Sequence, residues 1–163
     1  MATNADSPNA PLRWIRLWPI FLGLAILGWY VWFSQFSWNA LLTAAHEGDA
    51  KRVKAILARG VPVDARDPMG KSTALMAAAH NPGHVEACRV LLDNGAHIDA
   101  RNAFGNTSLM LAASDGCTEV VRLLLSRGAN RNATNNAGHT ALYLAQKEGH
   151  NDTAALLEQT AAR

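Results

Sequence analysis

Beyond its first 38 residues this sequence has almost no aromatic side chains, and it carries almost no net charge. Phe104 and Tyr143 are the only aromatic residues after Trp38, and the formal net charge of the chain is +2. A near-neutral chain offers no basic field for nucleic acid, so we expect no nucleic-acid partner. Without large side chains, a core must come from many small Ala and Leu contacts. A repeat architecture provides such a core, because neighbouring repeats bury each other's apolar faces.

The sequence also lacks a recognisable catalytic array. Its Ser, His and Asp residues are scattered over predicted turns, and no glycine-rich phosphate loop precedes a helix. His80, His84 and Cys88 recur at four-residue spacing, which on one continuous helix would align three metal ligands. Pro82 and Gly83 interrupt that helix. We therefore expect no enzymatic activity, no metal and no cofactor.

One long uncharged run, residues 17–36, contrasts with this small-residue chain. In a helix, about 20 residues rise about 30 Å, which is the thickness of the hydrocarbon core of a bilayer. Amphipathic aromatic rings favour the headgroup level, and they cluster at both ends of the run: Trp14 and Trp18 at one end, Trp29, Tyr30, Trp32 and Trp38 at the other. We expect a short tail over residues 1–16 and a transmembrane helix over residues 17–36.

A cleaved signal peptide is the main alternative, because Arg13 and Arg16 precede the apolar run. The bulky residues Phe36 and Trp38 follow the run where a signal peptidase requires small ones, which favours an uncleaved anchor. The same two arginines place the amino terminus in the cytoplasm and the rest of the chain outside it. The opposite topology stays open, because Lys51 and its neighbours partly offset this charge difference. The run contains no GxxxG motif, so homo-oligomerisation is not predicted.

Glycines reveal an internal repeat in the remaining chain. Two series step by 35 and then 33 residues: Gly60, Gly95 and Gly128, and Gly70, Gly105 and Gly138. Each step carries a similar sequence, seen best in residues 105–113, and Thr-Ala-Leu recurs at Thr73 and at Thr140. This pattern resembles the ankyrin repeat family. The resemblance implies an all-α solenoid over residues 38–161, with four helix-turn-helix repeats (38–67, 68–102, 103–135 and 136–161) and short β-hairpin fingers between them.

The repeated residue types have physical reasons. Thr73, Thr107 and Thr140 can cap the first helix of each repeat by accepting hydrogen bonds from free amide groups. Gly60, Gly95 and Gly128 can end the second helix, where a positive φ favours glycine. Repeat two carries two extra residues, one between Gly70 and Thr73 and one in the turn at residues 80–83. We expect Cys88 and Cys117 to be unpaired, because stacked repeats hold them farther apart than the about 7 Å that a disulfide allows.

The resemblance also implies where a partner binds: on the concave face formed by finger tips and first helices. The residues at these positions are Arg66, Met69, Lys71, Arg101, Phe104, Asn106, Asp115 and His139. Phe104 and Met69 stand out, because a large apolar side chain on an exposed finger has no role in a core and resembles an interface hot spot. The alternative is that scattered exposed apolar residues are ordinary.

The sequence therefore predicts a non-catalytic, membrane-anchored protein-interaction module, acting as a scaffold, accessory subunit or assembly factor for a membrane or periplasmic complex. Its expected location is the bacterial inner membrane, crossed once, with the ankyrin domain in the periplasm. The repeats begin almost directly after the anchor, which favours a membrane or membrane-associated protein as the partner. Two alternatives remain: a cytosol-facing adaptor that recruits soluble proteins, and an accessory protein of envelope stress defence.

Overall fold

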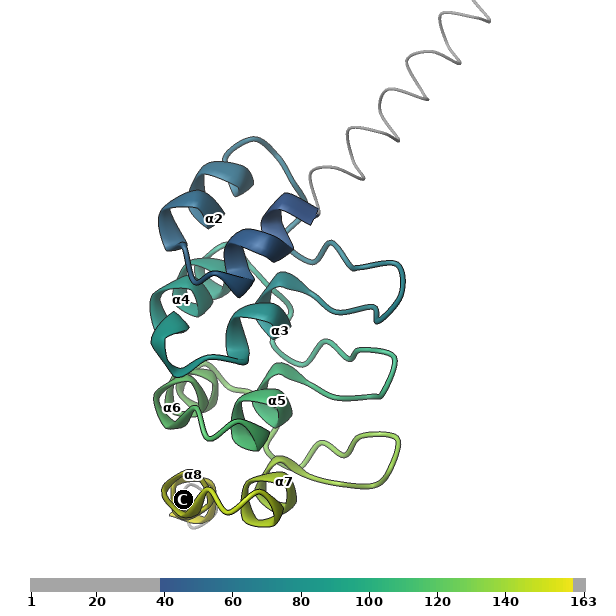
Figure 1. Cartoon of the computed structure of the whole chain (residues 1–163), viewed down its shortest axis with the longest axis vertical. Helices are drawn as coiled ribbons and strands as arrows, with labels where there is room; N and C mark the ends of the chain where they lie inside the picture. Colours follow the sequence, from purple (N-terminus) through teal and green to yellow (C-terminus); the bar gives the residue numbers. More distant parts are fainter. Residues whose placement is uncertain (1–38, 160–163) are drawn as a thin grey trace, which may run out of the picture. The chain divides into compact units, whose positions relative to one another are not determined.

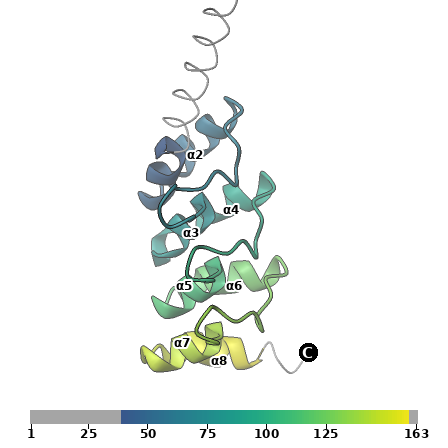
Figure 2. The same cartoon turned by 90° about the vertical axis from the view of Figure 1, so that its right-hand side faces the viewer.

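The computed structural model describes residues 39–159, which form a stack of antiparallel helix pairs (Figure 1). The chain is helical over residues 39–46 and then over α2 (Ala50–Leu57), which completes the first pair. The later pairs are α3 (Ala74–Ala79) with α4 (Val85–Asp93), α5 (Ser108–Ser114) with α6 (Thr118–Ser126), and α7 (Ala141–Lys147) with α8 (Asn151–Gln159). A 3-10 turn, η1 (Pro82–His84), precedes α4. Figure 2 shows the same stack from the side of the loops that follow α2, α4 and α6.

The predicted membrane span at residues 17–36 and the six aromatic residues around it lie outside the described residues. Between residues 39 and 159, no helix is both long and apolar enough to cross a bilayer.

Threonine begins the first helix of three repeats, as the sequence predicts. Thr73, Thr107 and Thr140 have extended backbone conformations, and their side chains accept hydrogen bonds from the amides of Met76, Met110 and Tyr143 at 3.4, 3.4 and 3.2 Å. Such a cap satisfies an amide that has no partner inside the helix. Thr73 and Thr107 are buried, so each cap also fixes where a helix enters the stack.

Alanine makes the first helices thin enough to pack closely. The pairs Ala44–Ala45, Ala78–Ala79 and Ala112–Ala113 are completely buried. Leucine and valine of the second helices fill the remaining space, with Val53, Leu91 and Leu124 fully buried. The core is therefore a continuous column of small contacts that runs through all four pairs.

The fingers are turns and not the β-hairpins that the resemblance implies. Two backbone hydrogen bonds close each finger. The first residue of the finger donates to the last one, in the pairs Asp67–Ser72, Asn102–Asn106 and Asn135–His139, and its carbonyl accepts from Lys71 N, Gly105 N and Gly138 N respectively. Three or four residues lie between the bonded pairs, the described backbone bonds do not continue the pairing outward, and no strand forms in the part of the chain that the structure describes. The fingers are instead linked to one another, because Ala103 N donates to Gly70 O at 2.9 Å and Asn136 N donates to Phe104 O at 3.1 Å.

The extra residue of the first finger is Lys71, and it takes over a glycine's conformation. Gly105 and Gly138 have positive φ values of 76° and 79° in the two later fingers, whereas Lys71, with a φ of 54°, replaces Gly70 in this role. Lys71 is the only residue other than glycine with a positive φ between residues 39 and 159. The insertion therefore keeps the finger compact and adds backbone strain.

We expect Lys71→Gly to raise the free energy of unfolding by about 0.5–1 kcal/mol. A side chain in the left-handed conformation costs about 1–2 kcal/mol, and the greater flexibility of unfolded glycine offsets part of the gain. Chemical denaturation would measure the change, with Lys71→Ala as the control, because alanine removes the charge and retains the Cβ atom. Equal stabilisation by both substitutions would assign the effect to the charge and contradict the strain.

Candidate partner-binding surface

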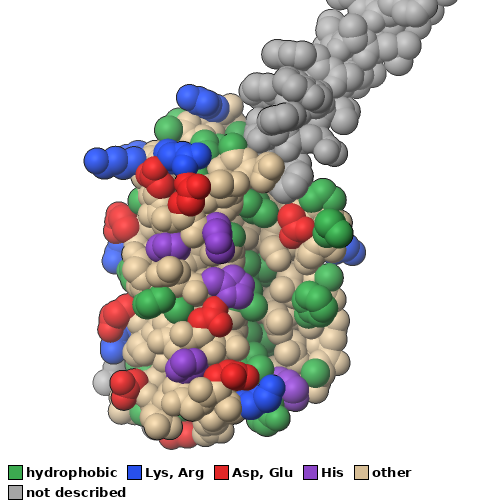
Figure 3. Space-filling view, in the orientation of Figure 1, with side chains coloured by type: hydrophobic (Ala, Val, Ile, Leu, Met, Phe, Trp, Pro, Cys, Tyr) green, Lys and Arg blue, Asp and Glu red, His purple; other side chains and the backbone are tan. Residues whose placement is uncertain are grey.

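The most exposed large apolar side chains of the described residues stand on the fingers. Met69 is 93% exposed and Phe104 is 70% exposed. They occupy equivalent positions, two residues after Asp67 and Asn102, which begin the two fingers. Apolar groups lie on the outer edge of the finger side of the molecule (Figure 3). The sequence-based expectation that both side chains are exposed is therefore confirmed.

Each finger holds its tip in place with one short polar side chain. Asp67 Oδ1 accepts from the amides of Met69 and Gly70 at 2.9 and 2.5 Å, while its Oδ2 accepts from Ser72 at 2.6 Å. These amide donors, with Gly70 the strongest, hold the pKa of the Asp67 carboxyl below its usual value. Asn102 and Asn135 make the equivalent bonds in the other two fingers at 2.9–3.0 Å. The tips are therefore positioned before any partner arrives.

Arg66 ties the first finger to the second. Its Nη1 donates to Lys71 O at 3.0 Å and to Arg101 O at 2.7 Å. Arg101, at the equivalent point one repeat on, uses Nε to donate to Gly105 O at 3.2 Å and remains exposed. The hydrogen bonds of Arg66 and Arg101 thus stabilise the shape of the fingers, and both positive charges remain at the finger surface.

Two other candidate residues also take part in the finger framework. Asn106 Oδ1 accepts from Asn135 Nδ2 of the next finger at 2.8 Å. The His139 ring stacks on Tyr143, with ring centroids 4.2 Å apart and planes at 24°. Arg66, Met69, Lys71, Arg101, Phe104, Asn106 and His139 thus all lie on the three neighbouring fingers.

Asp115, the last candidate, lies elsewhere. It follows α5 at the end opposite the fingers, and its Oδ2 lies 2.6 Å from His80 Nδ1 of the preceding repeat. Its visible role is a link between the turns of adjacent repeats. The fingers and this turn therefore do not form one compact patch.

His84 and His150 follow glycine in the turns of repeats two and four, a pattern of the ankyrin family in which the histidine is expected to brace the turn. In the structure each ring packs on the turn glycine of the preceding repeat. The His84 ring packs over Gly48 so closely that a Cβ there would lie 2.6 Å from Nε2 and 2.7 Å from Cγ. His150 covers Gly116 in the same way two repeats later. The Gly-His pairs at residues 83–84 and 149–150 were the available signal. It becomes interpretable only once the stacking order of the repeats is known.

Acid is expected to weaken the packing of His84 on Gly48. His84 Nδ1 is buried and has no hydrogen-bond partner within residues 39–159. Burial, and then the nearby His46, lower the pKa of His84 below its usual value of 6.5. The unfolded chain thus binds this proton more tightly than the folded one. Packing of the neutral His84 ring therefore stabilises the fold fully above about pH 6.5, and this contribution is lost as the pH falls through the lowered pKa of the folded chain.

The free energy of unfolding should therefore fall below pH 6.5, by less than the limit of about 1.4 kcal/mol per pH unit for one group. His84→Asn should reduce the slope, because asparagine does not titrate in this range. Denaturation curves between pH 7.5 and pH 5 in wild type and His84→Asn, with His97→Asn as an exposed-histidine control, would measure it. Equal slopes in wild type and His84→Asn would contradict the assignment.

The cysteines offer no reactive centre. Cys88 and Cys117 are buried free thiols. Burial raises the pKa of Cys88 to about 12 and that of Cys117 to about 11, with the neighbouring Cys117 and Asp115 adding to the respective shifts. A thiol that stays protonated is a poor nucleophile and a poor metal ligand. Across residues 39–159, no group of three or more His, Cys, Asp and Glu side chains could hold a metal ion.

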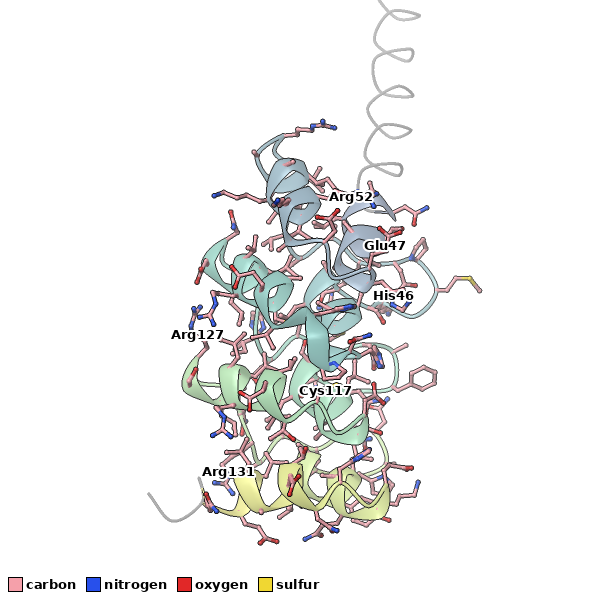
Figure 4. All side chains as sticks on the ribbon, turned by 60° about the vertical axis from the view of Figure 1, so that its left-hand side comes forward. His46, Glu47, Arg52, Cys117, Arg127 and Arg131 are labelled. Carbon is pink, nitrogen blue, oxygen red and sulfur yellow. The ribbon has the colours of Figure 1, made fainter. Side chains whose placement is uncertain are left out.

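Polar side chains on the side away from the fingers link successive repeats. Arg127 Nη1 pairs with Asp93 Oδ1 at 2.8 Å, and Arg131 Nη2 donates to Leu157 O at 2.7 Å. Figure 4 shows these two arginines on the second-helix side, and Glu47 close to its ion-pair partner Arg52 in the first repeat. These contacts stabilise the stack, whereas the finger tips have large side chains without a structural role.

A stack of helix pairs in which each repeat packs against its neighbours defines the class of helical-repeat solenoids. A sequence-family model of ankyrin repeats, in three copies, matches residues 25–102 and residues 96–162. The chain therefore belongs to the ankyrin repeat family, whose repeats are protein-protein interaction modules and are typically non-catalytic. A search of curated proteins gave no match.

Proposed function

We propose that this protein is a membrane-anchored binding module that holds a protein partner on its finger surface. The observation that carries the proposal is the exposure of Met69 and Phe104 on tips that the fold already holds rigid. Rigid apolar anchors give affinity because little conformational entropy is lost on binding. Arg101 and Lys71 stand beside them, and arginine next to an aromatic side chain is typical of interface hot spots.

The anchor is the sequence run at residues 17–36. Only residues 37 and 38 separate it from the helix that begins the described part, so the tether is short. A short tether gives a high effective concentration only near its anchor, which favours a partner in or on the same membrane. Arg13 and Arg16 favour a cytoplasmic amino terminus, which in a bacterial inner membrane, the proposed location, puts the ankyrin domain in the periplasm. A scaffold, accessory subunit or assembly factor of an envelope complex fits these features.

Phe104→Ala, combined with Arg101→Ala, is expected to weaken partner binding at least tenfold, or about 1.4 kcal/mol. Phe104 is mostly exposed, so its removal should change the free energy of unfolding by less than about 0.5 kcal/mol. The measurement is a pull-down of tagged full-length protein in a mild detergent with quantitative mass spectrometry, beside thermal unfolding. Arg122→Ala, which removes an exposed arginine from α6, is the matched control.

A partner retained in full by the double variant would contradict docking through the tips. Topology needs a separate measurement: labelling of Ala155→Cys with a membrane-impermeant maleimide in intact spheroplasts. The native thiols are buried, so the added thiol reports alone. Labelling in intact spheroplasts supports the periplasmic location. Labelling only after lysis would instead favour the cytosol-facing adaptor.

A further inference from the structure

We propose that the partner presents one α-helix to the fingers, lying along the stack, with Met69 and Phe104 inserted into successive holes of its surface and acidic residues beside them. This inference rests on the proposed function, because it specifies what the tips bind. It is carried by three properties of the fingers: their rigidity, their spacing and their charge.

Rigidity of the backbone fixes the two points from which the apolar side chains, here called knobs, project. Asp67 and Asn102 accept hydrogen bonds from the amides of Met69 and Phe104 themselves, both at 2.9 Å. The fingers are joined through Gly70 O and Ala103 N at 2.9 Å, and Arg66 crosses between them to Arg101 O at 2.7 Å. The relative position of the two knobs is thus set by the backbone. The partner surface must therefore fit the two tips as they stand, without a rearrangement of the fingers.

Spacing favours a helix as the matching surface. Met69 and Phe104 are equivalent residues of adjacent repeats, so they repeat with the pitch of the stack, and packed helices lie about 8–10 Å apart. Two turns of an α-helix, or about seven residues, rise about 11 Å. Holes between four side chains recur at this interval along one helix face, and each accepts a knob. Residues of an extended strand on one face recur every 6–7 Å, which fits the pitch less well.

Charge determines what flanks the holes. The acidic side chains of the fingers are turned to backbone amides: Asp64 accepts from His97 N at 3.0 Å, Asp99 accepts from Asn130 N at 2.9 Å, and Asp67 accepts from three amides.

The cations of the fingers, by contrast, have no carboxylate partner. No ion pair within residues 39–159 involves Arg66, Lys71 or Arg101. All three are exposed, and the two arginines donate only to carbonyl groups. A carboxylate on the partner would complete these sites, and complementary charge would also fix the direction of the bound helix.

Site-specific photocross-linking in cells tests this inference on the full-length chain. The photoreactive residue p-benzoylphenylalanine replaces Met69 in one variant and Phe104 in another, and mass spectrometry identifies the partner residue that each one labels. We expect both to label one helix of the same protein, at points six to eight residues apart, with Asp or Glu within one turn. A variant with p-benzoylphenylalanine in place of Ala155, which is exposed on α8, is the control for non-specific labelling.

Charge is tested by Lys71→Glu in the Phe104 cross-linking variant. The Lys71 side chain makes no hydrogen bond or ion pair between residues 39 and 159, so its reversal breaks none there. We expect the cross-link yield to fall at least twofold, while Lys51→Glu, which reverses an exposed cation of α2, leaves it unchanged.

The outcomes separate the two proposals. Labels on a strand or loop of a protein partner, labels at another spacing, or a yield unaffected by Lys71→Glu would overturn the helix inference and leave tip docking intact. Labels on lipid alone, or no protein label above that of the Ala155 control, would overturn tip docking and the helix with it.

Discussion

Gly105→Ala is expected to be the most damaging single-methyl change on the fingers, lowering the free energy of unfolding by about 3 kcal/mol. Gly105 has a φ of 76°, where a side chain costs about 1–2 kcal/mol. Its new Cβ would also lie 2.8 Å from the backbone nitrogen of Asn136 and in contact with the Asn136 side chain. That nitrogen donates to Phe104 O, so it cannot move without breaking the link between the second and third fingers.

Gly138→Ala separates these two costs. Gly138 occupies the same position of the next finger with a φ of 79°, and a Cβ there meets nothing within 4 Å among the described residues. We expect it to cost only the conformational part, about 1 kcal/mol. Urea denaturation of both variants measures the difference. Equal losses would show that the third finger gives way freely and would contradict the rigid tip arrangement on which the proposed docking depends.

The repeat pattern was sufficient to predict the stack because it reflects local rules. A threonine in an extended conformation caps the first helix of three repeats, as expected: Thr73, Thr107 and Thr140. The glycines after the second helices also have the expected positive φ: Gly60, Gly95 and Gly128. The exposure of Met69 and Phe104 was also predicted from their positions on the fingers of their repeats. Neither prediction needed knowledge of which residues meet across repeats.

The features that could not be predicted depend on contacts between repeats. Arg66 was singled out as a binding residue, and the sequence gave no sign that its guanidinium spans two fingers to reach Arg101 O. The sequence showed that the first finger has an extra residue at Lys71. It did not show that Lys71, and not Gly70, would adopt the positive φ. The fingers form turns in place of β-hairpins, because the described backbone hydrogen bonds do not extend the pairing beyond the residues that close each turn.

The pairing of Gly116 with His150 leads to the other large expected effect. Gly116 has a φ of 69°, and a Cβ there would lie 2.8 Å from Cγ and Cε1 of the His150 ring and in contact with its Nδ1. We expect Gly116→Ala to cost about 2–3 kcal/mol, from backbone strain together with displacement of the ring between the third and fourth repeats. Gly83→Ala is the control at the corresponding turn of repeat two, where the insertion leaves φ outside the positive range and only Asn81 Oδ1 within 4 Å of a Cβ, at 3.4 Å.

In contrast to Gly105, the obstacle at Gly116 is a side chain, so it can be removed. In a His150→Ala background, Gly116→Ala should cost only the strain of its φ, about 1 kcal/mol, which gives a coupling energy of about 1–2 kcal/mol in a double-mutant cycle. Denaturation of the wild type, the two single variants and the double variant measures it. Strictly additive free-energy changes would mean that displacing the His150 ring does not destabilise the fold. The junction between the last two repeats would then depend on the buried helix contacts alone. Coupling of the expected size would instead show that His150, packed on Gly116, stabilises this junction. The small turn residues would then contribute to the rigidity that presents Met69 and Phe104 to a partner.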